Sequence, residues 1–421
     1  MFKYQVVLSD FPYTTIWRDF AWPMSVTLQK FLFKWWKYQY LNYHVFDFAL
    51  HCLNAFLLSK IAEKLKLPYT RLLFLFFLLH PSNVITVAWM IQLKTLLSFF
   101  FALISFYCLI RTEENKKWYL LSWLFFTFSL LSKSASIPLP VFFLFFVFKK
   151  VSRKELLWLI PFFILSALTS YQVINSKVTK AGIDLAPSTA VTKVEKPASI
   201  INAELLKPRF ITTISTFHYY FWQSVLPVEN RPVKGLNYFS PGINQYLHVV
   251  FIILIVIITW GSASAYYLGA GYLMILPFMG LIRAPFMNVT WISDQHLYLA
   301  LPFFICFWLS LISRIKVKYA EHFPLLFIPF FCYQVATTTP YYQDDVAFYS
   351  ASLEADALNV PIAYNLAMSY ISRGKINEAL EVTGTMVQMA QVAPEILSSL
   401  YYPDIFLLHM QLQNKIDKKS P

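Results

Sequence analysis

Long apolar segments joined by short connections constrain the fold of this chain more than any other feature of its sequence. Hydrophobic residues make up 57% of the 421 residues and the mean hydropathy is +0.52, well beyond what soluble domains carry. Because lipid offers no hydrogen-bond partners to backbone groups, such segments cross a membrane as helices. We therefore expect an all-α polytopic membrane bundle of about 10–11 membrane segments. The candidate spans are 43–60, 72–91, 94–110, 118–132, 136–148, 155–174, 245–260, 264–282, 296–313 and 323–337, with 210–226 as a doubtful eleventh.

The positive charges lie mainly at the ends of the apolar segments, which is the pattern that orients a membrane protein. The formal net charge is +13, yet no basic groove suited to nucleic acid stands out. We expect the lysine- and arginine-rich connections to be cytoplasmic, namely those near 60–71, 111–117, 149–154 and 314–318. The alternate connections then lie outside, namely 80–94, 133–136, 176–208 and 283–295.

Counting crossings from both ends gives two further expectations. Regions 176–208 and 227–243 both come out external, so we expect 210–226 to be re-entrant or interfacial; a true span with a misassigned neighbour is the alternative. Residues 1–40 also come out external, although no signal peptide or apolar span precedes them. We therefore expect an N-terminal transmembrane helix to be missing, either because the true start lies upstream of Met1 or because a partner supplies it.

The run HPSNVITVAWMIQLKTLL at 80–97 places polar groups between two very apolar flanks. His80, Asn83, Gln92 and Lys94 fall at depths where a polar side chain is costly unless it faces a protein interior or a water-filled cavity. We therefore interpret these residues as candidates for a functional site. The alternative is a kinked helix with capping groups near the membrane interface.

A second polar pattern lies in the segment that starts near residue 43. His44, Asp47, His51 and Asn54 fall at i, i+3, i+7 and i+10, on one face of a helix that must point into the bundle. Ligands spread over nearly three turns do not all reach one ion, so we interpret the stripe as polar packing and expect no metal site. We interpret the four scattered cysteines as small buried residues, namely Cys52, Cys108, Cys306 and Cys332.

After residue 338 the composition becomes that of a soluble domain. The run YNLAMSYISRGKINEALEV at 364–382 has small residues and Gly374 at the spacing of a tetratricopeptide helix pair. One such repeat does not bury its own apolar face. We therefore divide the chain into an external region, 1–40, a transmembrane domain, 41–338, and a tetratricopeptide-like domain, 339–421, which should lean on the membrane domain or on a partner.

Several segments, taken in order, resemble bacterial GT-C membrane glycosyltransferases with C-terminal tetratricopeptide repeats, a family similar to the transmembrane-and-tetratricopeptide O-mannosyltransferases. The family's HPVHTEAVAWISQRKTLL is similar to 80–97, and its YHLTNLLLHALNALLL is similar to YHVFDFALHCLNAFLL at 43–58. Its LLAKETAVTLPLVLL resembles LLSKSASIPLPVFFL at 130–144, and its ADRYLYLP resembles SDQHLYLAL at 293–301. Four matches in the same order make the resemblance specific for the fold.

The resemblance implies transfer of a sugar, mannose being one candidate, from a polyprenyl-phosphate lipid to a protein or envelope-glycan acceptor. The reaction would take place on the external face of the bacterial inner membrane, with the tetratricopeptide domain on the periplasmic side to select the acceptor. A carboxylate would take the proton of the attacking hydroxyl, and basic groups would stabilise the leaving phosphate. The resemblance implies no certain cofactor, with a divalent cation as an open option.

The chain departs from the family pattern at its charged positions. No acidic pair stands in residues 1–40, where Asp10 and Asp19 are isolated; with Asp294 they are the weak candidates for a catalytic base, and ordinary surface charges are the alternative. Ile85, Leu93, Ser134 and Gln295 replace charged residues of the family. His296 is interpreted as an interfacial histidine. The retained candidates for binding the donor phosphate are Lys94, Lys133, His80 and Gln92.

Two classes of function follow from these observations. The first is an enzyme, a GT-C glycosyltransferase that uses a polyprenyl-phosphate sugar. The second is a catalytically inactive membrane scaffold that keeps the fold and uses its repeats for protein interaction, since fold alone does not decide activity. A transporter has little support, because the sequence shows no inverted repeat of spans.

Overall fold

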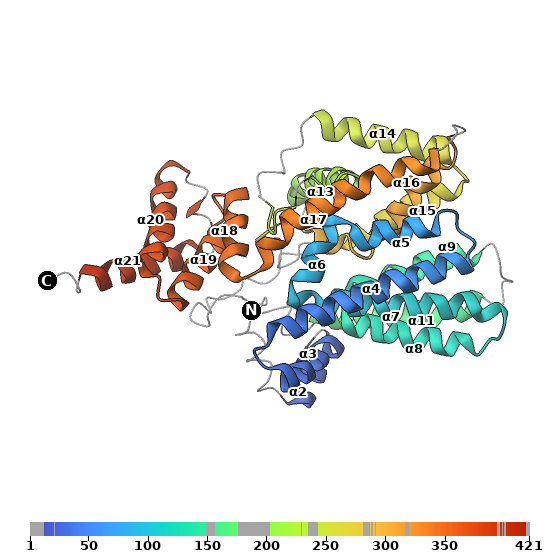
Figure 1. Ribbon diagram of the computed structural model, residues 1–421, viewed down its shortest axis with the longest axis horizontal. Helices are drawn as coiled ribbons and strands as arrows, with labels where there is room; N and C mark the ends of the chain where they lie inside the picture. The colour runs from blue at the N-terminus through green and yellow to red at the C-terminus, as the bar shows by residue number, and fades with distance from the viewer. Residues whose placement is uncertain are drawn as a thin grey trace.

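The computed structural model is helical throughout the part of the chain that it describes, without a strand in that part. The described residues are 12–20, 22–148, 156–175, 203–228, 230–234, 243–280, 287, 289–290, 292–315, 320–393, 396–397, 399 and 401–417. Figure 1 shows an elongated molecule in which a bundle of long helices carries a smaller helical lobe at one end. The helices are α2 Tyr13–Asp19, α3 Pro23–Trp36, α4 Tyr40–Lys64, α5 Thr70–Leu79, α6 Val84–Ala88, α7 Leu93–Ile110, α8 Trp118–Ser132, α9 Leu139–Phe148, α11 Ile160–Asn175, α13 Ala203–Gln223, α14 Ile243–Thr259, α15 Ala263–Ile275, α16 Leu301–Ile312, α17 Phe327–Thr338, α18 Asp345–Ala355, α19 Val360–Ser372, α20 Ile376–Val392 and α21 Tyr402–Asp417.

Within the described residues, two helices are long and apolar enough to cross a membrane. They are Tyr40–Lys64 and the continuous helical stretch Met90–Glu113. A third candidate is a bent pair, α5 followed by the helical segment Pro81–Ala88. The chain thus carries helices suited to a membrane, and the all-α bundle is confirmed in that coarse form. The full set of ten or eleven spans and the side on which each connection lies stay predictions.

The predicted span 72–91 is wrong as a single helix. Helix α5 ends at Leu79, and the next helical segment is bent by 51° relative to it. Pro81 lacks a backbone N–H and His80 takes an extended conformation, so the α-helical ladder stops there. The break is closed by side chains: Asn83 Nδ2 donates to the carbonyl of Phe77 at 2.7 Å, and His80 Nδ1 accepts from the Ser82 amide at 3.3 Å.

Serine side chains let two neighbouring helices of the bundle approach closely. Ser98 of α7, Ser129 of α8 and Ser136 after α8 form a buried hydroxyl cluster with Oγ–Oγ distances of 2.7–3.2 Å. Ser105 and Ser122 repeat the pattern farther along the same pair, where Ser105 Oγ donates to the Ser122 carbonyl at 2.8 Å. Small hydroxylated residues are typical of helix contacts in membranes, because they combine close backbone packing with hydrogen bonds.

The doubtful segment 210–226 forms part of one continuous helix, α13, which runs from Ala203 to Gln223. In Figure 1 this helix is seen nearly along its axis, whereas α4, α7 and α8 run across the view. Its last turns are anchored to the bundle interior through Tyr219, Tyr220 and Gln223, all buried. The position of α13 relative to the membrane stays a prediction.

The stripe on α4 faces the bundle interior as expected. Asp47, His51 and Asn54 are almost fully buried, while His44 is half-buried. His51 Nδ1 lies 2.8 Å from the Tyr298 hydroxyl, and Asn54 Nδ2 donates to the carbonyl of Leu96 at 3.0 Å. These contacts tie α4 to α7 and to the segment before α16, which is a packing role. The expected burial of the cysteines is wrong for Cys332, which is exposed on the outer side of α17.

The C-terminal lobe consists of α18–α21 and packs on the bundle at the end where α6 lies (Figure 1). Phe348 and Ile362 of the lobe share an apolar cluster with Val84 and Ile85, and Asn359 Nδ2 donates to the carbonyl of Val289 at 2.9 Å. The lobe therefore leans on the membrane domain. Its own packing uses small side chains that are fully buried between α19 and α20, namely Ala363, Ala367 and Ala379. Its assignment as a tetratricopeptide domain stays a prediction.

Candidate functional site

A buried lysine marks the end of the bundle where α7 begins and α8 ends. Lys133 is 6% exposed, and its Nζ donates to Thr95 Oγ1 at 2.6 Å and to Gln92 Oε1 at 3.5 Å. Thr95 Oγ1 in turn donates to Gln92 Oε1 at 2.7 Å. The ammonium group is therefore held by neutral oxygens from two helix ends. We call Lys133, Gln92, Thr95 and Lys94 the lysine site.

Local backbone structure explains why these side chains meet. Two short 3-10 segments, η2 Met90–Gln92 and η4 Ser134–Ser136, interrupt the helices on either side of the site. Lys133 ends α8 in an extended conformation, with φ −161° and ψ 138°, so its side chain leaves the helix axis. Gln92 precedes the first turn of α7, and Thr95 lies within that turn. A helix begins after each break, and the positive end of a helix dipole favours an anion at that point.

Positive charge gathers at the lysine site without a negative partner among the described residues. Lys94, in the first turn of α7, lies with its Nζ 4.5 Å from the centre of the Trp22 ring. It is close enough to Lys133 for the two charges to repel one another. No carboxylate in the described part of the chain forms an ion pair with either lysine. A cation in the first turn of a helix also interacts unfavourably with the helix dipole. A bound anion would offset this interaction as well as the repulsion between the two lysines.

His296 belongs to the same neighbourhood. Its side chain is buried and stacks on Phe278, with ring centroids 4.0 Å apart and planes 14° apart. Its imidazole is close enough to interact electrostatically with Lys133 and Lys94. The histidine that the sequence suggested to be an ordinary interfacial residue thus lies beside the lysine site.

A second buried lysine lies in a network of a different kind. Lys234 Nζ is 2.9 Å from Asp294 Oδ2, and both side chains are nearly inaccessible. Tyr219 Oη donates to Asp294 Oδ1 at 2.6 Å, and Gln223 Nε2 donates to Oδ2 at 3.1 Å. Lys234 Nζ also donates to the Tyr219 hydroxyl. Gln223 Nε2 continues the network to Asn230 Oδ1 at 3.1 Å. We call this set the aspartate network.

The aspartate network bears on the predicted role of Asp294. Three donors occupy three of the about four lone-pair sites on its two carboxylate oxygens, so most of its accepting capacity is used inside the protein. Its charge is neutralised by Lys234, which the sequence analysis did not single out. The geometry is that of a joint between α13, the segment after it and η9 Asp294–His296.

The other predicted residues lie elsewhere or outside the described part. Both ring nitrogens of His80 contact backbone: Nδ1 accepts from Ser82 and Nε2 lies 3.3 Å from the carbonyl of Ser224. His80 therefore ties the break after α5 to the end of α13. Asp10 lies outside the described residues, and Asp19 is the last residue of α2. Of the four predicted phosphate ligands, Lys94, Lys133 and Gln92 are brought together.

The residues that the sequence reasoning missed are Thr95, Trp22 and Lys234. Thr95 had a signal, since it is another polar residue inside the run 80–97. Trp22 and Lys234 had none, because their partners are far away in the sequence. The described residues hold no group of three or more histidine, cysteine, aspartate or glutamate side chains that could hold a metal ion.

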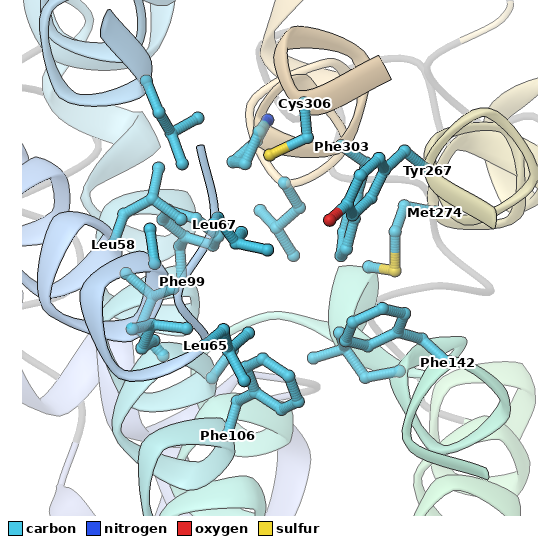
Figure 2. A pocket seen from close by; sticks show the side chains of 18 of the residues that line it. Leu58, Leu65, Leu67, Phe99, Phe106, Phe142, Tyr267, Met274, Phe303 and Cys306 are labelled. Carbon is cyan, nitrogen blue, oxygen red and sulfur yellow. The ribbon is translucent and has the colours of Figure 1, made fainter. Parts of the chain in front are cut away.

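An apolar cavity of about 90 Å³ lies farther along the bundle, between α4 and α7 on one side and α9, α15 and α16 on the other. Figure 2 shows Leu58 and Phe99 on one side of it, and Phe142, Tyr267 and Met274 on the other. The lining is almost entirely apolar. A cavity with such a lining holds apolar groups rather than water.

Comparison with known proteins adds no relative: no protein-family model matches the chain, and no curated protein or solved structure matches it significantly.

Proposed function

We propose that this protein is an integral membrane glycosyltransferase that takes a sugar, mannose being one candidate, from a polyprenyl-phosphate lipid and transfers it to a protein or envelope-glycan acceptor on the external face. One observation carries the proposal: the buried Lys133 and the half-buried Lys94 beside it have no acidic partner in the described part of the chain. A buried charge without a partner is costly, so such a site is best explained by an anionic ligand.

The chemistry fits a lipid phosphate. As the acceptor hydroxyl attacks the anomeric carbon, the bond to the phosphate oxygen breaks and negative charge develops on the phosphate. Lys133 is already held in place by Thr95 and Gln92, so its charge need not reorganise as the phosphate leaves. Lys94 adds a second positive charge at the same point. Both lysines would stabilise the leaving group.

The apolar cavity is consistent with a donor that carries a hydrocarbon chain, because it has room for a short stretch of such a chain. It is lined by residues of α7, which begins directly after Gln92, and of α9, which begins six residues after Lys133. A lipid with its phosphate at the lysine site therefore has apolar space along the same helices. The C-terminal lobe packs beside α6, near enough to the site's end of the bundle to present an acceptor.

The test is transfer of radiolabelled sugar from polyprenyl-phosphate donors to membrane acceptors. We expect wild-type membranes to transfer sugar and Lys133→Gln to reduce the rate at least tenfold, since one donor to a developing oxyanion is worth roughly 10²–10³ in rate. Lys60→Gln is the matched control, because Lys60 is exposed and its ion pair is with Glu63 of the same helix, at 2.7 Å. Equal rates for Lys133→Gln and wild type would contradict the phosphate assignment.

A second candidate is a catalytically inactive scaffold that binds the lipid and docks proteins through its C-terminal lobe. The observation in its favour is that Asp294, the candidate base nearest in sequence to His296, is held by three donors inside the protein. The two candidates separate in one experiment. A scaffold would retain polyprenyl phosphate in a lysine-dependent way and transfer no sugar from any donor, whereas the enzyme would do both.

A further inference from the structure

We propose that the exposed side of α3 and the turn after it form a membrane-interface surface that binds anionic lipid headgroups. The surface consists of Lys30, Phe31, Lys34, Trp35 and Lys37, and it continues into Tyr38 and Tyr40. It is distinct from the lysine site and does not rest on the proposed enzymatic function.

One side of α3 is fixed to the bundle. Val26, Gln29 and Leu32 are buried, with exposed fractions of 3%, 5% and 6%. Ser25 Oγ donates to the carbonyl of Ser132, the last residue of α8, at 3.0 Å. The helix is therefore held against the end of α8, immediately beside Lys133. Figure 1 shows α2 and α3 together at the start of α4, on the outside of the bundle.

The opposite side exposes large aromatic rings. Trp35 is 68% exposed and Phe31 is 49% exposed, and their ring centroids lie 6.2 Å apart, one helical turn from each other. Tyr38 and Tyr40 are also exposed, at 59% and 61%. Isolated exposed rings are common on protein surfaces, but a continuous row of them marks a contact surface. Aromatic rings with a polar edge are enriched where a membrane meets water.

Lysines alternate with these rings. Lys34 and Lys37 are exposed, and no carboxylate of the described chain forms an ion pair with them. Lys30 Nζ lies 4.7 Å from the centre of the Tyr13 ring. Rows of lysines and aromatic rings on one side of a helix are the composition of interfacial helices, whose cations attract anionic headgroups.

The position along the chain places this surface at the right depth. Helix α4 is one of the candidate spans, and it begins at Tyr40, directly after the turn that ends α3. Lys37 has a positive φ of 46° and turns the chain from α3 into α4. Residues 31–40 therefore lie next to the point where α4 enters the membrane. The predicted sidedness places these lysines on the external side of the membrane, whereas lysines next to a transmembrane helix usually lie on the cytoplasmic side. Binding to anionic lipid headgroups would explain why lysines occur here.

The test places a spin label on the surface of the full-length protein in lipid nanodiscs. Trp35→Cys and, in a second protein, Phe31→Cys are labelled after the four native cysteines are replaced by alanine. Met410→Cys, 46% exposed on α21 in the C-terminal lobe, is the matched control. We expect labels 35 and 31 to be severalfold more accessible to oxygen than to a water-soluble nickel complex, relative to label 410. Two sites guard against failure of one variant.

A second experiment tests whether the lysines bind anionic headgroups. We expect label 35 to move deeper when phosphatidylglycerol is added to phosphatidylcholine, and Lys30→Gln with Lys34→Gln and Lys37→Gln to abolish that shift. Three results would overturn the proposal. They are nickel accessibility at 35 and 31 equal to that at 410, protection of both sites from both reagents, which would mean a protein partner or a second copy, and an unchanged lipid response in the triple variant.

Discussion

Two buried lysines of the same bundle differ in what surrounds them. Lys234 faces Asp294, and its charge is neutralised inside the protein, with Tyr219 and Gln223 completing the network. Lys133 is just as inaccessible, but in the described part of the chain it donates to the neutral oxygens of Thr95 and Gln92, with Lys94 close by. The first arrangement is complete without a ligand. The second accumulates positive charge, which is why we assign ligand binding to the lysine site and a structural role to the aspartate network.

The largest effect should come from breaking the aspartate network. Lys234→Met leaves the Asp294 carboxylate buried without its cation, and removal of one partner of a buried pair costs roughly 3–5 kcal/mol of unfolding free energy. The measurement is thermal or denaturant unfolding in detergent. The double variant Lys234→Met with Asp294→Leu should recover most of the loss. If Lys234→Met alone is as stable as wild type, the aspartate network does not stabilise the fold.

A smaller effect should come from one hydrogen bond of that network. Tyr219→Phe removes the donor to Asp294 Oδ1 while preserving the ring, and a bond to a charged group contributes about 1.5–3 kcal/mol. Thr95→Val is the matched change at the lysine site, and because Thr95 Oγ1 accepts from the Lys133 ammonium it should cost a similar amount, about 1.5–3 kcal/mol. Unfolding midpoints of the two variants measured side by side check both values. No loss of stability in Thr95→Val would show that the Lys133 ammonium does not depend on Thr95.

Lys133→Met should change stability in the opposite sense to Lys234→Met. Removing an unpaired buried charge leaves the free energy of unfolding unchanged or raises it by about 1–2 kcal/mol, because no charged partner is left behind and Thr95 and Gln92 still bond each other. The same variant should lose retention of polyprenyl phosphate. If Lys133→Met unfolds as readily as Lys234→Met, then Lys133 is structural and the contrast between the two lysines fails.

The smallest effect concerns an exposed charge cluster in the C-terminal lobe. Burial acts to raise the pKa of Asp344, but the amide of Ala347 and the guanidinium of Arg373 outweigh it and bring the pKa below its usual value. Its contribution to stability is therefore present above the unfolded-state pKa of about 4 and is lost as the pH falls through the lower folded-state value. Because the pair is exposed, we expect less than about 1 kcal/mol.

Hydrogen exchange of the α18 amides between pH 3 and 6, corrected for intrinsic rates, measures this effect. Asp344→Asn is the control, because asparagine also caps a helix but does not titrate there. Wild type should lose protection towards low pH, and the variant should not. Equal pH profiles would show that the Asp344 charge does not hold the start of α18.

The sequence predicted those parts of the molecule that depend on local pattern. The burial of Asp47, His51 and Asn54 followed from helical periodicity, and so did the start of α7 next to Lys94. The single span 72–91 was wrong, because apolar composition continued across a break that Pro81 and Asn83 create; the kinked helix with capping groups, stated as the alternative, is what the structure shows there. A hydropathy average does not detect such a break, because one proline that lacks a backbone N–H is enough to interrupt the helical hydrogen bonds.

The site was predictable only in part, because half of it depends on contacts between distant segments. Gln92 and Lys94 share a run with Thr95, so their proximity was visible in the sequence. The pairing of Lys234 with Asp294, 60 residues apart, was not. Asp294 therefore looked like a candidate base, and only its donors show that it is engaged. Ionisable residues are interpretable once their partners are known.

The most direct measurement of the central claim is retention of polyprenyl phosphate by the purified full-length protein, followed by native mass spectrometry. We predict that wild type and the control Lys60→Gln retain the lipid, that Lys133→Gln loses at least tenfold in affinity, and that polyprenol without a phosphate is retained equally weakly by all three. Equal retention of polyprenyl phosphate by wild type and Lys133→Gln would contradict the claim that the buried, acid-free lysine site binds the phosphate.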